Sequence, residues 1–385
     1  MTTALIALCL AQGKSVIKVP ILFPAPASFL KAPKGYKVTL FADNLKQVRM
    51  MAVAPNGDVF AVQTRIEKKA PSHPHQVTVL WDSNQDGVAD QRELWSDHLD
   101  LPFGIQFGFG HLYVANTGSV VRWPYRLGQK TAVDPPETVI SNIPDLGYRN
   151  HWTRNIFIDG LKRTLYLTIG SKDNVAVEPS NRGVVQKFVI DDKGKVVGGP
   201  KTVTSGMRNP IGLDQQPVTR HMYVNVVERD YLGDHVPDDF VTRLREGGFY
   251  GWPYYYDVSK VDKRVPRRPD LAKKVLRPDF RLDAHVSPID LKFSKGGQMS
   301  AFYGDAFVAL HGSQNRSVLN GYKVVRLRFK NGKPTGEYED FVTGWLPSRS
   351  GTKIYGRPSG LAILPDGSLL IADDWGGKIW RVSKI

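Results

Sequence analysis

The hydrophobic and polar positions of this chain repeat as an apolar alternating strand, a tight turn and a second apolar strand. Alternation of apolar and polar residues over about four to eight positions is typical of β-strands, and Gly, Asn and Asp supply the backbone conformations of tight turns. The six units with this pattern are residues 50–63, 102–117, 154–170, 209–226, 288–312 and 358–373. The sequence therefore predicts a protein built from strands and turns.

The spacing of these units indicates how the strands are grouped. The units begin at residues 50, 102, 154, 209, 288 and 358, which are 52, 52, 55, 79 and 70 residues apart. Repeats of about 40 to 50 residues with four strands each are typical of β-propellers. We therefore predict an all-β protein, a six-bladed β-propeller that forms a single domain over residues 33–385.

Two further features concern how the predicted ring closes and where it is interrupted. The early strand 35–41 could pair with the late strands 368–371 and 378–382, which would join the two ends of the chain. Residues 227–282 are rich in Pro, Arg, Asp and Tyr, and we predict them as the largest insertion. The pattern predicts no long helix and no linker between domains.

The N-terminus differs in composition from the rest of the chain. Residues 4–11 form an apolar run that contains Cys9, the only cysteine. A membrane-spanning helix needs about 20 apolar residues, whereas the core of a signal peptide needs about 7 to 15. We predict that residues 1–14 are a signal peptide or a disordered N-terminus, that the chain has no transmembrane span, and that the protein is periplasmic or secreted.

The charge of the chain favours anionic partners. The 52 Lys and Arg residues exceed the 37 Asp and Glu residues, which gives a formal net charge of +15. The basic residues are spread along the sequence, and no basic run is interleaved with aromatic residues as single-stranded nucleic acid would require. The composition therefore favours small anionic ligands and predicts no nucleic-acid partner.

Charged residues immediately precede the first strand of several units. In a propeller the first strand of each blade lines the central channel, so the residues before these strands gather at one end of the axis. These positions hold His151, Arg154, Arg208, Asn209 and Arg357. Because buried like charges repel one another, arginines that share a pocket indicate an anionic ligand, such as a small polycarboxylate.

The same positions belong to motifs that resemble a known family. The motifs are His151-x-x-Arg154, Gly206-Met207-Arg208-Asn209-Pro210, Glu228-Arg229-Asp230, Gly247-Gly248-Phe249-Tyr250-Gly251-Trp252-Pro253, His311-Gly312-Ser313-Gln314-Asn315-Arg316 and Gly356-Arg357-Pro358. In this order and spacing they resemble the pyrroloquinoline-quinone (PQQ) dependent sugar dehydrogenases, in particular the sorbosone dehydrogenase-like branch. The resemblance runs from about residue 33 to the C-terminus, and it implies a six-bladed propeller with PQQ at the mouth of the channel.

The resemblance implies a role for each of these residues. His151 would accept the proton of a sugar hydroxyl as hydride passes to the quinone, and a channel-lining histidine bonded to backbone is the alternative. Arg154 would steady the quinone or the substrate, with a structural salt bridge as the alternative. The residues implied as cofactor ligands, which suit quinone oxygens and carboxylates, are Arg208, Asn209, Arg316 and Arg357.

Two segments are candidate calcium sites. The resemblance implies a Ca²⁺ ion held by consecutive backbone carbonyls, which fall at Asp230 and Tyr231 in place of the Gly-Pro of the soluble glucose enzymes. Independently, Asp82, Asn84 and Asp86 stand in a loop that satisfies the EF-hand pattern. The segments on either side of this loop have the pattern of strands, so a β-hairpin turn is the alternative.

The resemblance and the predicted rim together indicate a PQQ- and calcium-dependent dehydrogenase that oxidises a sugar or a related polyol or aldehyde. Its electrons would pass to an external cytochrome or quinone. Two alternatives stay open: a propeller that only binds a ligand or partner, and a lactonase-like hydrolase. Such a hydrolase would need a metal ion held by several acidic side chains in the channel. The predicted rim offers arginines instead, which favours the dehydrogenase.

Overall fold

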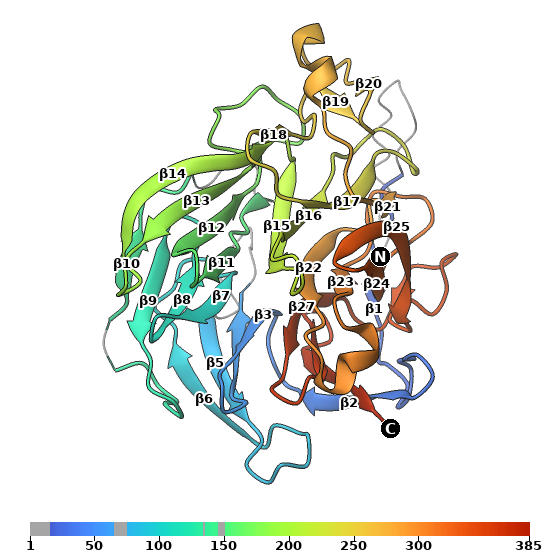
Figure 1. The fold of residues 1–385 in the computed structure, drawn as a ribbon. Helices are drawn as coiled ribbons and strands as arrows, with labels where there is room; N and C mark the ends of the chain where they lie inside the picture. The colour runs from blue at the N-terminus through green and yellow to red at the C-terminus, as the bar shows by residue number, and fades with distance from the viewer. Residues whose placement is uncertain (1–15, 65–74, 134, 145–150) are drawn as a thin grey trace, which may run out of the picture.

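The computed structural model describes residues 16–64, 75–133, 135–144 and 151–385, and these residues form a ring of six β-sheets (Figure 1). Each sheet is a blade that contains four antiparallel strands. The first three blades consist of β3 (Val48–Val53), β4 (Val59–Gln63), β5 (Gln76–Trp81) and β6 (Gln91–Ser96); β7 (Ile105–Gly108), β8 (His111–Ala115), β9 (Val120–Pro124) and β10 (Glu137–Ile140); and β11 (Ile156–Asp159), β12 (Thr164–Ile169), β13 (Val184–Ile190) and β14 (Val196–Ser205).

The other three blades complete the ring. They consist of β15 (Asn209–Gln215), β16 (Met222–Val227), β17 (Asp238–Arg243) and β21 (Phe280–Ala284); β22 (Pro288–Phe293), β23 (Ala306–Leu310), β24 (Lys323–Lys330) and β25 (Lys333–Val342); and β27 (Pro358–Ile363), β28 (Leu369–Asp373), β29 (Lys378–Lys384) and β2 (Tyr36–Ala42). The first strands of neighbouring blades contact one another around the axis. Each strand-turn-strand unit predicted from the sequence supplies the first two strands of one blade, so the predicted six-bladed propeller is confirmed.

The ring is closed by a strand from the beginning of the chain. β2 pairs antiparallel with β29, from Tyr36 opposite Lys384 to Ala42 opposite Ile379. The last blade therefore combines the two ends of the described chain, and the predicted closure by residues 35–41 is confirmed. Because β2 pairs with β29 along its length, with one irregularity between Leu40 and Ala42, the last blade closes the ring.

The hydrophobic core lies between neighbouring blades. Phe60 of the first blade packs against Trp95 with ring centroids 5.3 Å apart, and Trp95 packs against Trp123 of the second blade at 6.4 Å. All three side chains are buried. Such large rings fill the space between blades, where each sheet must bury a face that it cannot bury alone.

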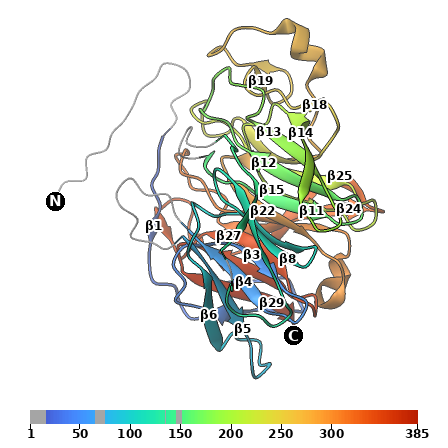
Figure 2. The ribbon, with the colours of Figure 1, turned by 90° about the vertical axis from the view of Figure 1, so that its left-hand side faces the viewer.

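The insertion in the fourth blade is shorter than the sequence pattern predicts. Residues 227–282 include β17 and β21, which are the third and fourth strands of this blade. Their charged residues, among them Asp238, Asp239 and Arg281, interrupt the apolar alternation that would have revealed the strands. The remaining insertion, residues 244–279, projects beyond the blades (Figures 1 and 2). It contains β18 (Gly248–Phe249), the hairpin β19 (Tyr255–Tyr256) and β20 (Lys260–Val261), and the 3-10 helix η2 (Pro269–Lys274).

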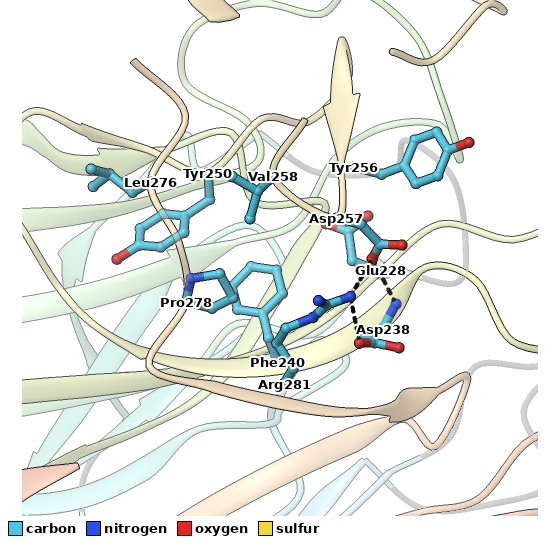
Figure 3. A pocket seen from close by; sticks show the side chains of 10 residues that line it. All are labelled: Glu228, Asp238, Phe240, Tyr250, Tyr256, Asp257, Val258, Leu276, Pro278 and Arg281. Carbon is cyan, nitrogen blue, oxygen red and sulfur yellow. Dashed lines mark hydrogen bonds and ion pairs between the residues drawn. The ribbon is translucent and has the colours of Figure 1, made fainter. Parts of the chain in front are cut away.

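Arg281 ties this insertion to the fourth blade. Its guanidinium pairs with Asp238 of β17 at 2.8 Å and with Asp257 of the insertion at 3.4 Å (Figure 3). Beside these pairs, the rings of Phe240 and Tyr250 stack with centroids 5.7 Å apart. The cavity between these side chains has a volume of about 20 Å³, which holds about one water molecule. It is a packing gap and not a ligand site.

The segment predicted as a signal peptide or a disordered N-terminus, residues 1–14 with Cys9, lies outside the described residues. The described residues contain no long helix, as the pattern predicts. Their helices are short 3-10 segments, such as η2 and η3 (Gly297–Phe302). Within residues 16–64, 75–133, 135–144 and 151–385, no helix is long and apolar enough to cross a membrane.

Candidate active site

A cavity of about 350 Å³ opens at one end of the propeller axis. Its lining comes from the ends of strands and from loops of several blades, and it includes His151, Arg208, Asn209 and Arg357. These four residues are separated by up to 206 positions (357 − 151) in the sequence. The structure therefore brings together the residues that their position in the repeat placed at a common rim.

Among the described residues, three guanidinium groups line the cavity, those of Arg49, Arg208 and Arg357. Arg208 is buried, donates to the Glu228 carbonyl at 2.8 Å and pairs with Asp230 at 3.0 Å. Burial lowers the pKa of Arg357, and the nearby charge of Arg49 adds to this effect. An anionic ligand would relieve the repulsion among these cations, so the cavity favours negative charge.

Several buried polar atoms of this lining have no hydrogen-bond partner within the described structure. They are the Nε atoms of Arg49 and Arg208 and the Oδ1 atoms of Asn209 and Asn315. A buried polar group left without a partner costs about 1 to 3 kcal/mol, and natural proteins rarely tolerate several of them together. Their position around one cavity indicates a ligand with both hydrogen-bond acceptors and donors.

His151 is buried in the lining, and its tautomer follows from its hydrogen bonds. Nδ1 lies 3.1 Å from the Ser171 carbonyl oxygen and 2.9 Å from Ser171 Oγ, whose own proton goes to the Asp173 carbonyl at 2.7 Å. Because a carbonyl oxygen can only accept, Nδ1 carries the proton and Nε2 carries the lone pair. Burial and the charge of Arg208 lower the pKa of His151 well below its ordinary value. The ring is therefore neutral and able to accept a proton at Nε2.

His311 lines the same cavity and is backed by a carboxylate. Its Nε2 lies 3.0 Å from both carboxylate oxygens of Asp374, which also pairs with Arg49. Burial lowers the pKa of His311 to about 4, so the neutral ring donates from Nε2. Although burial opposes ionisation of Asp374, His311 and Arg49 outweigh it and hold the pKa of this carboxyl low. The carboxylate thus fixes the orientation of both His311 and Arg49.

Arg49 and Asp374 belong to the site although neither was predicted from the sequence. Arg49 stands immediately before the first predicted unit, just as Arg208 stands before Asn209, so its place in the repeat could have revealed it. Asp374 follows β28, and its contact with His311 joins the fifth and sixth blades. No local pattern in the sequence contains that contact.

Arg154 lies beside the cavity and is not part of its lining. It is 1% exposed, and its guanidinium donates to the carbonyl oxygens of His151 at 2.9 Å, Thr153 at 2.8 Å and Pro144 at 2.5 Å. These bonds hold the loop that carries His151. The terminal guanidinium nitrogens of Arg154 thus donate to backbone, and contact of Arg154 with the quinone or the substrate stays a prediction.

We expect Arg154→Ala to destabilise the fold by about 3 kcal/mol, because several buried carbonyl oxygens would lose a charged donor. Thermal or denaturant unfolding measures the loss. Arg163→Ala is the matched control, because Arg163 is 58% exposed and pairs with Asp192 at the surface. Such exposed pairs contribute at most about 1 kcal/mol. An Arg154→Ala variant as stable as the control would contradict the supporting role of Arg154.

Arg316 and His285 are also held by the protein itself. Arg316 donates to the Ala284 carbonyl at 3.1 Å and lies 3.3 Å from Nδ1 of His235. It is absent from the cavity lining, and its role as a cofactor ligand stays a prediction. His285 does line the cavity, but its Nε2 is bonded to the Gly233 carbonyl at 2.9 Å. Both residues therefore support the walls of the cavity.

The carbonyl expected to hold calcium is already bonded. Asp230 and Tyr231 both line the cavity, but the carbonyl oxygen of Asp230 accepts from Asn174 Nδ2 at 3.2 Å and from the Arg264 guanidinium at 3.0 Å. A cation at this oxygen would meet the positive charge of Arg264. Among the residues that the structure describes, no group of three or more acidic, His or Cys side chains could hold a metal. This arrangement does not fit calcium at the Asp230 carbonyl.

The EF-hand-like loop is a β-hairpin turn, as the alternative interpretation predicts, because it joins β5 to β6. Its side-chain oxygens are engaged within the turn. Asp82 accepts from the backbone N–H groups of Asp86 at 3.2 Å and Gly87 at 2.7 Å, and Asn84 Oδ1 accepts from Asp86 N at 3.0 Å. Asp86 in turn accepts from Val88 N at 2.8 Å. These oxygens hold the turn, and the strands that flank it replace the helices of an EF-hand.

The fold and the site define a class: a six-bladed propeller whose axis ends in a cationic cavity with a neutral, buried histidine. The chain belongs to the TrAA12-like family, whose profile matches residues 30–236 and 269–385. The unmatched residues between these two ranges fall in the fourth blade and its insertion.

Comparison with known proteins adds a chemical context. The chain is 24% identical over 335 residues to the pyrroloquinoline quinone-dependent pyranose dehydrogenase of Coprinopsis cinerea, a match that covers 72% of this chain and 45% of that enzyme. The holo form of the PQQ domain of a C. cinerea pyranose dehydrogenase superimposes with a TM-score of 0.75 at 19% identity, covering 94% of this chain and 98% of that one. The calcium structure of a Trichoderma reesei carbohydrate-active enzyme of family AA12 gives 0.76 at 18% identity, covering 98% and 99%.

These matches confirm the predicted resemblance to the PQQ-dependent sugar dehydrogenases. Because this chain spans less than half of the curated C. cinerea enzyme, the activity of that whole enzyme is not transferred by the match. The likeness of the solved structures concerns the fold.

Proposed function

We propose that this protein is a PQQ-dependent dehydrogenase that oxidises a sugar or a related polyol or aldehyde. The observation that carries the proposal is the cavity itself, where three arginines, unsatisfied buried polar atoms and a neutral histidine converge. PQQ is a quinone with three carboxylates, so its charge and its acceptor atoms suit this lining. The pyranose dehydrogenase of C. cinerea, named for its dependence on PQQ, is a relative of this chain.

The residues that would hold PQQ are Arg49, Arg208, Asn209 and Arg357, which line the cavity. The unpartnered Nε atoms of Arg49 and Arg208 can donate to carboxylate or quinone oxygens, and the unpartnered Oδ1 of Asn209 can accept from a ring N–H. When bound, PQQ supplies the group that accepts hydride from the sugar. The guanidinium groups offer positive charge where negative charge would develop on the quinone oxygens.

His151 would act as the general base for the sugar hydroxyl. Its Nδ1 proton is fixed on Ser171, so Nε2 accepts the hydroxyl proton and the Ser171 bond steadies the ring as charge develops. Burial keeps the ring neutral before the reaction. Because the anionic cofactor would offset the charge of Arg208, its binding would also make His151 a stronger base.

Two alternatives to the dehydrogenase were left open by the sequence. A lactonase-like hydrolase would need several acidic ligands in the channel, whereas the charged lining here is dominated by Arg49, Arg208 and Arg357. A propeller that only binds its ligand would not need a neutral histidine held in one tautomer. The oxidised sugar is of the aldose or sorbosone type in this proposal, the electron acceptor is an external cytochrome or quinone, and the enzyme acts in the periplasm or outside the cell.

Reconstitution with PQQ tests the proposal. We expect the purified protein to bind PQQ at about micromolar concentration, followed by the quinone absorbance, and then to reduce a dye with some member of a panel of aldoses and polyols. Protein that binds no PQQ would refute the proposal. We expect binding in EDTA to equal binding in Ca²⁺, because Arg264 occupies the Asp230 carbonyl. A strict requirement for Ca²⁺ would show that this guanidinium moves away to admit the ion.

The acid limb of the pH profile offers a further test. His151 accepts a proton only when it is neutral, so turnover falls as the pH drops through its pKa. Burial and Arg208 lower that pKa in the wild type. We expect Arg208→Ala to move the limb to higher pH, because the imidazolium is then less repelled. The measurement is turnover against pH at saturating PQQ, and a limb that stays in place or moves to lower pH would contradict the assignment.

A further inference from the structure

A segment before the first blade lies along the outside of the propeller at the cavity. Residues 16–23 contain β1 (Ile21–Leu22), which pairs parallel with β26 (Lys353–Ile354) and belongs to none of the six blades. The N–H of Ile21 donates to the Thr352 carbonyl at 2.7 Å, and the N–H of Phe23 donates to the Ile354 carbonyl at 2.9 Å. Figure 2 shows β1 at one edge of the molecule, outside the blades. We call residues 16–23 the strap.

The N-terminal part of the strap reaches the cavity. Ile17 belongs to the cavity lining although it lies 32 positions (49 − 17) before Arg49, the next lining residue in the sequence. The N–H of Lys18 donates to the carbonyl of Gln314 at 2.8 Å, and Gln314 is itself a lining residue. Lys18 Nζ also donates to the Ser350 carbonyl at 2.7 Å. Ile17 is therefore fixed at the wall by the residue that follows it.

Ile17 is chemically unlike the residues that hold charge in this cavity. Its side chain is apolar, and the residue is 54% exposed in the described structure. A ligand that fills the space beside an exposed apolar group of a cavity wall removes that group from water, which favours binding. The strap thus adds an apolar side chain to the wall of the cavity, while Arg49 and Arg208 supply polar groups.

We infer that Ile17 is a specificity-determining residue: the strap forms a wall of the ligand cavity, Ile17 packs against the ligand, and the bond from Lys18 to Gln314 holds the strap in place. This inference rests on the proposed function only for the identity of the ligand. The wall itself follows from the lining, from the Lys18 bond to Gln314 and from the β1–β26 pairing.

The rate at which a small reagent reaches the cavity tests whether the strap forms part of its wall, and this measurement needs no cofactor. Cys9 is the only cysteine, so Cys9→Ser combined with Ile289→Cys places a single thiol in the lining. Lys18→Pro removes the N–H that bonds Gln314, whereas Lys18→Ala keeps it and is the matched control. We expect iodoacetamide to alkylate the thiol about fivefold faster with Lys18→Pro than with Lys18→Ala, the factor that corresponds to one backbone hydrogen bond. Equal rates in variants of equal thermal stability would overturn the strap as a wall.

Ligand fit tests Ile17 itself. Ile17→Ser and Val19→Ser make the same kind of change on the strap, but Val19 is 61% exposed and lies outside the cavity lining. We expect Ile17→Ser to speed the dissociation of PQQ or raise the sugar KM by about threefold or more, as loss of a few buried methyl groups would, with kcat unchanged. Val19→Ser should match the wild type. If both variants match the wild type, Ile17 does not contribute to ligand specificity.

Wild-type protein that binds no PQQ would refute the proposed function. The alkylation rates would still show whether the strap forms a wall of the cavity.

Discussion

Replacement of His151 by alanine is expected to reduce turnover by about a thousandfold while PQQ remains bound, because a positioned general base contributes about 10² to 10⁴ to the rate. The loss should appear in kcat, since His151 acts on the hydroxyl proton and the cavity arginines supply the charge that holds the cofactor. The measurements are kcat of the reconstituted variant and its PQQ dissociation constant, determined on the same preparation.

Two comparisons make this result specific. His151→Gln keeps a side-chain N–H that can reach Ser171 but lacks a basic nitrogen, so it should be as inactive as the alanine variant if the base is what matters. His111→Ala changes a histidine of β8 that lies outside the cavity lining and should retain wild-type turnover. A His151→Ala enzyme within about tenfold of wild type would remove this residue as the base, and His311 would then be the neutral histidine to test.

Replacement of Arg208 by alanine is expected to weaken PQQ binding by about 10- to 100-fold and to lower turnover as well, because a hydrogen bond to a charged group contributes about 1.5 to 3 kcal/mol. The variant removes the buried guanidinium whose Nε has no partner and leaves Asp230 with Asn315 as its remaining side-chain donor within hydrogen-bonding distance. Titration of the apoprotein with PQQ measures the affinity. Turnover at saturating PQQ measures the second effect.

The size of the Arg208 effect depends on both charge and shape. Arg208→Lys keeps the charge but loses the planar fork, so we expect affinity between that of the wild type and that of Arg208→Ala. Arg268→Ala removes an exposed arginine of the insertion, paired with Asp270, and should bind PQQ as the wild type does. If Arg208→Ala binds PQQ with wild-type affinity while its thermal stability is unchanged, the cofactor lies elsewhere.

The blades were predictable because their signal is local. Alternation in β3 and β4 or in β27 and β28, with a Gly-containing turn between each pair, identifies the first two strands of a blade without knowledge of any other. The fourth blade was the exception. Its outer strands, β17 and β21, carry charged residues and enclose the insertion, so 227–282 has the pattern of one long insertion. Pairing between β17 and β21 exists only once the sheet has formed.

The sequence predicted which residues lie at the candidate site, but it did not predict which partners they contact. The repeat placed His151, Arg208, Asn209 and Arg357 at one rim, and all four line the cavity. Arg49 could have been predicted at this rim in the same way, because it also stands at the start of a unit. Ile17 had no such signal, since the strap belongs to no repeat and reaches the cavity only through its bonds to the fifth and sixth blades.

The amino-acid sequence alone determined the six blades, their order and the rim positions, because strand alternation, turn residues and repeat spacing are properties of short segments. Only the tertiary structure decided that Arg208 lines the cavity while Arg154, at the same position of the preceding blade, lies beside it, although both donate to backbone carbonyls. It also decided that Asp374 orients His311. The direction of a buried side chain depends on which partners from distant segments satisfy its polar atoms, and those partners meet only when the ring has closed.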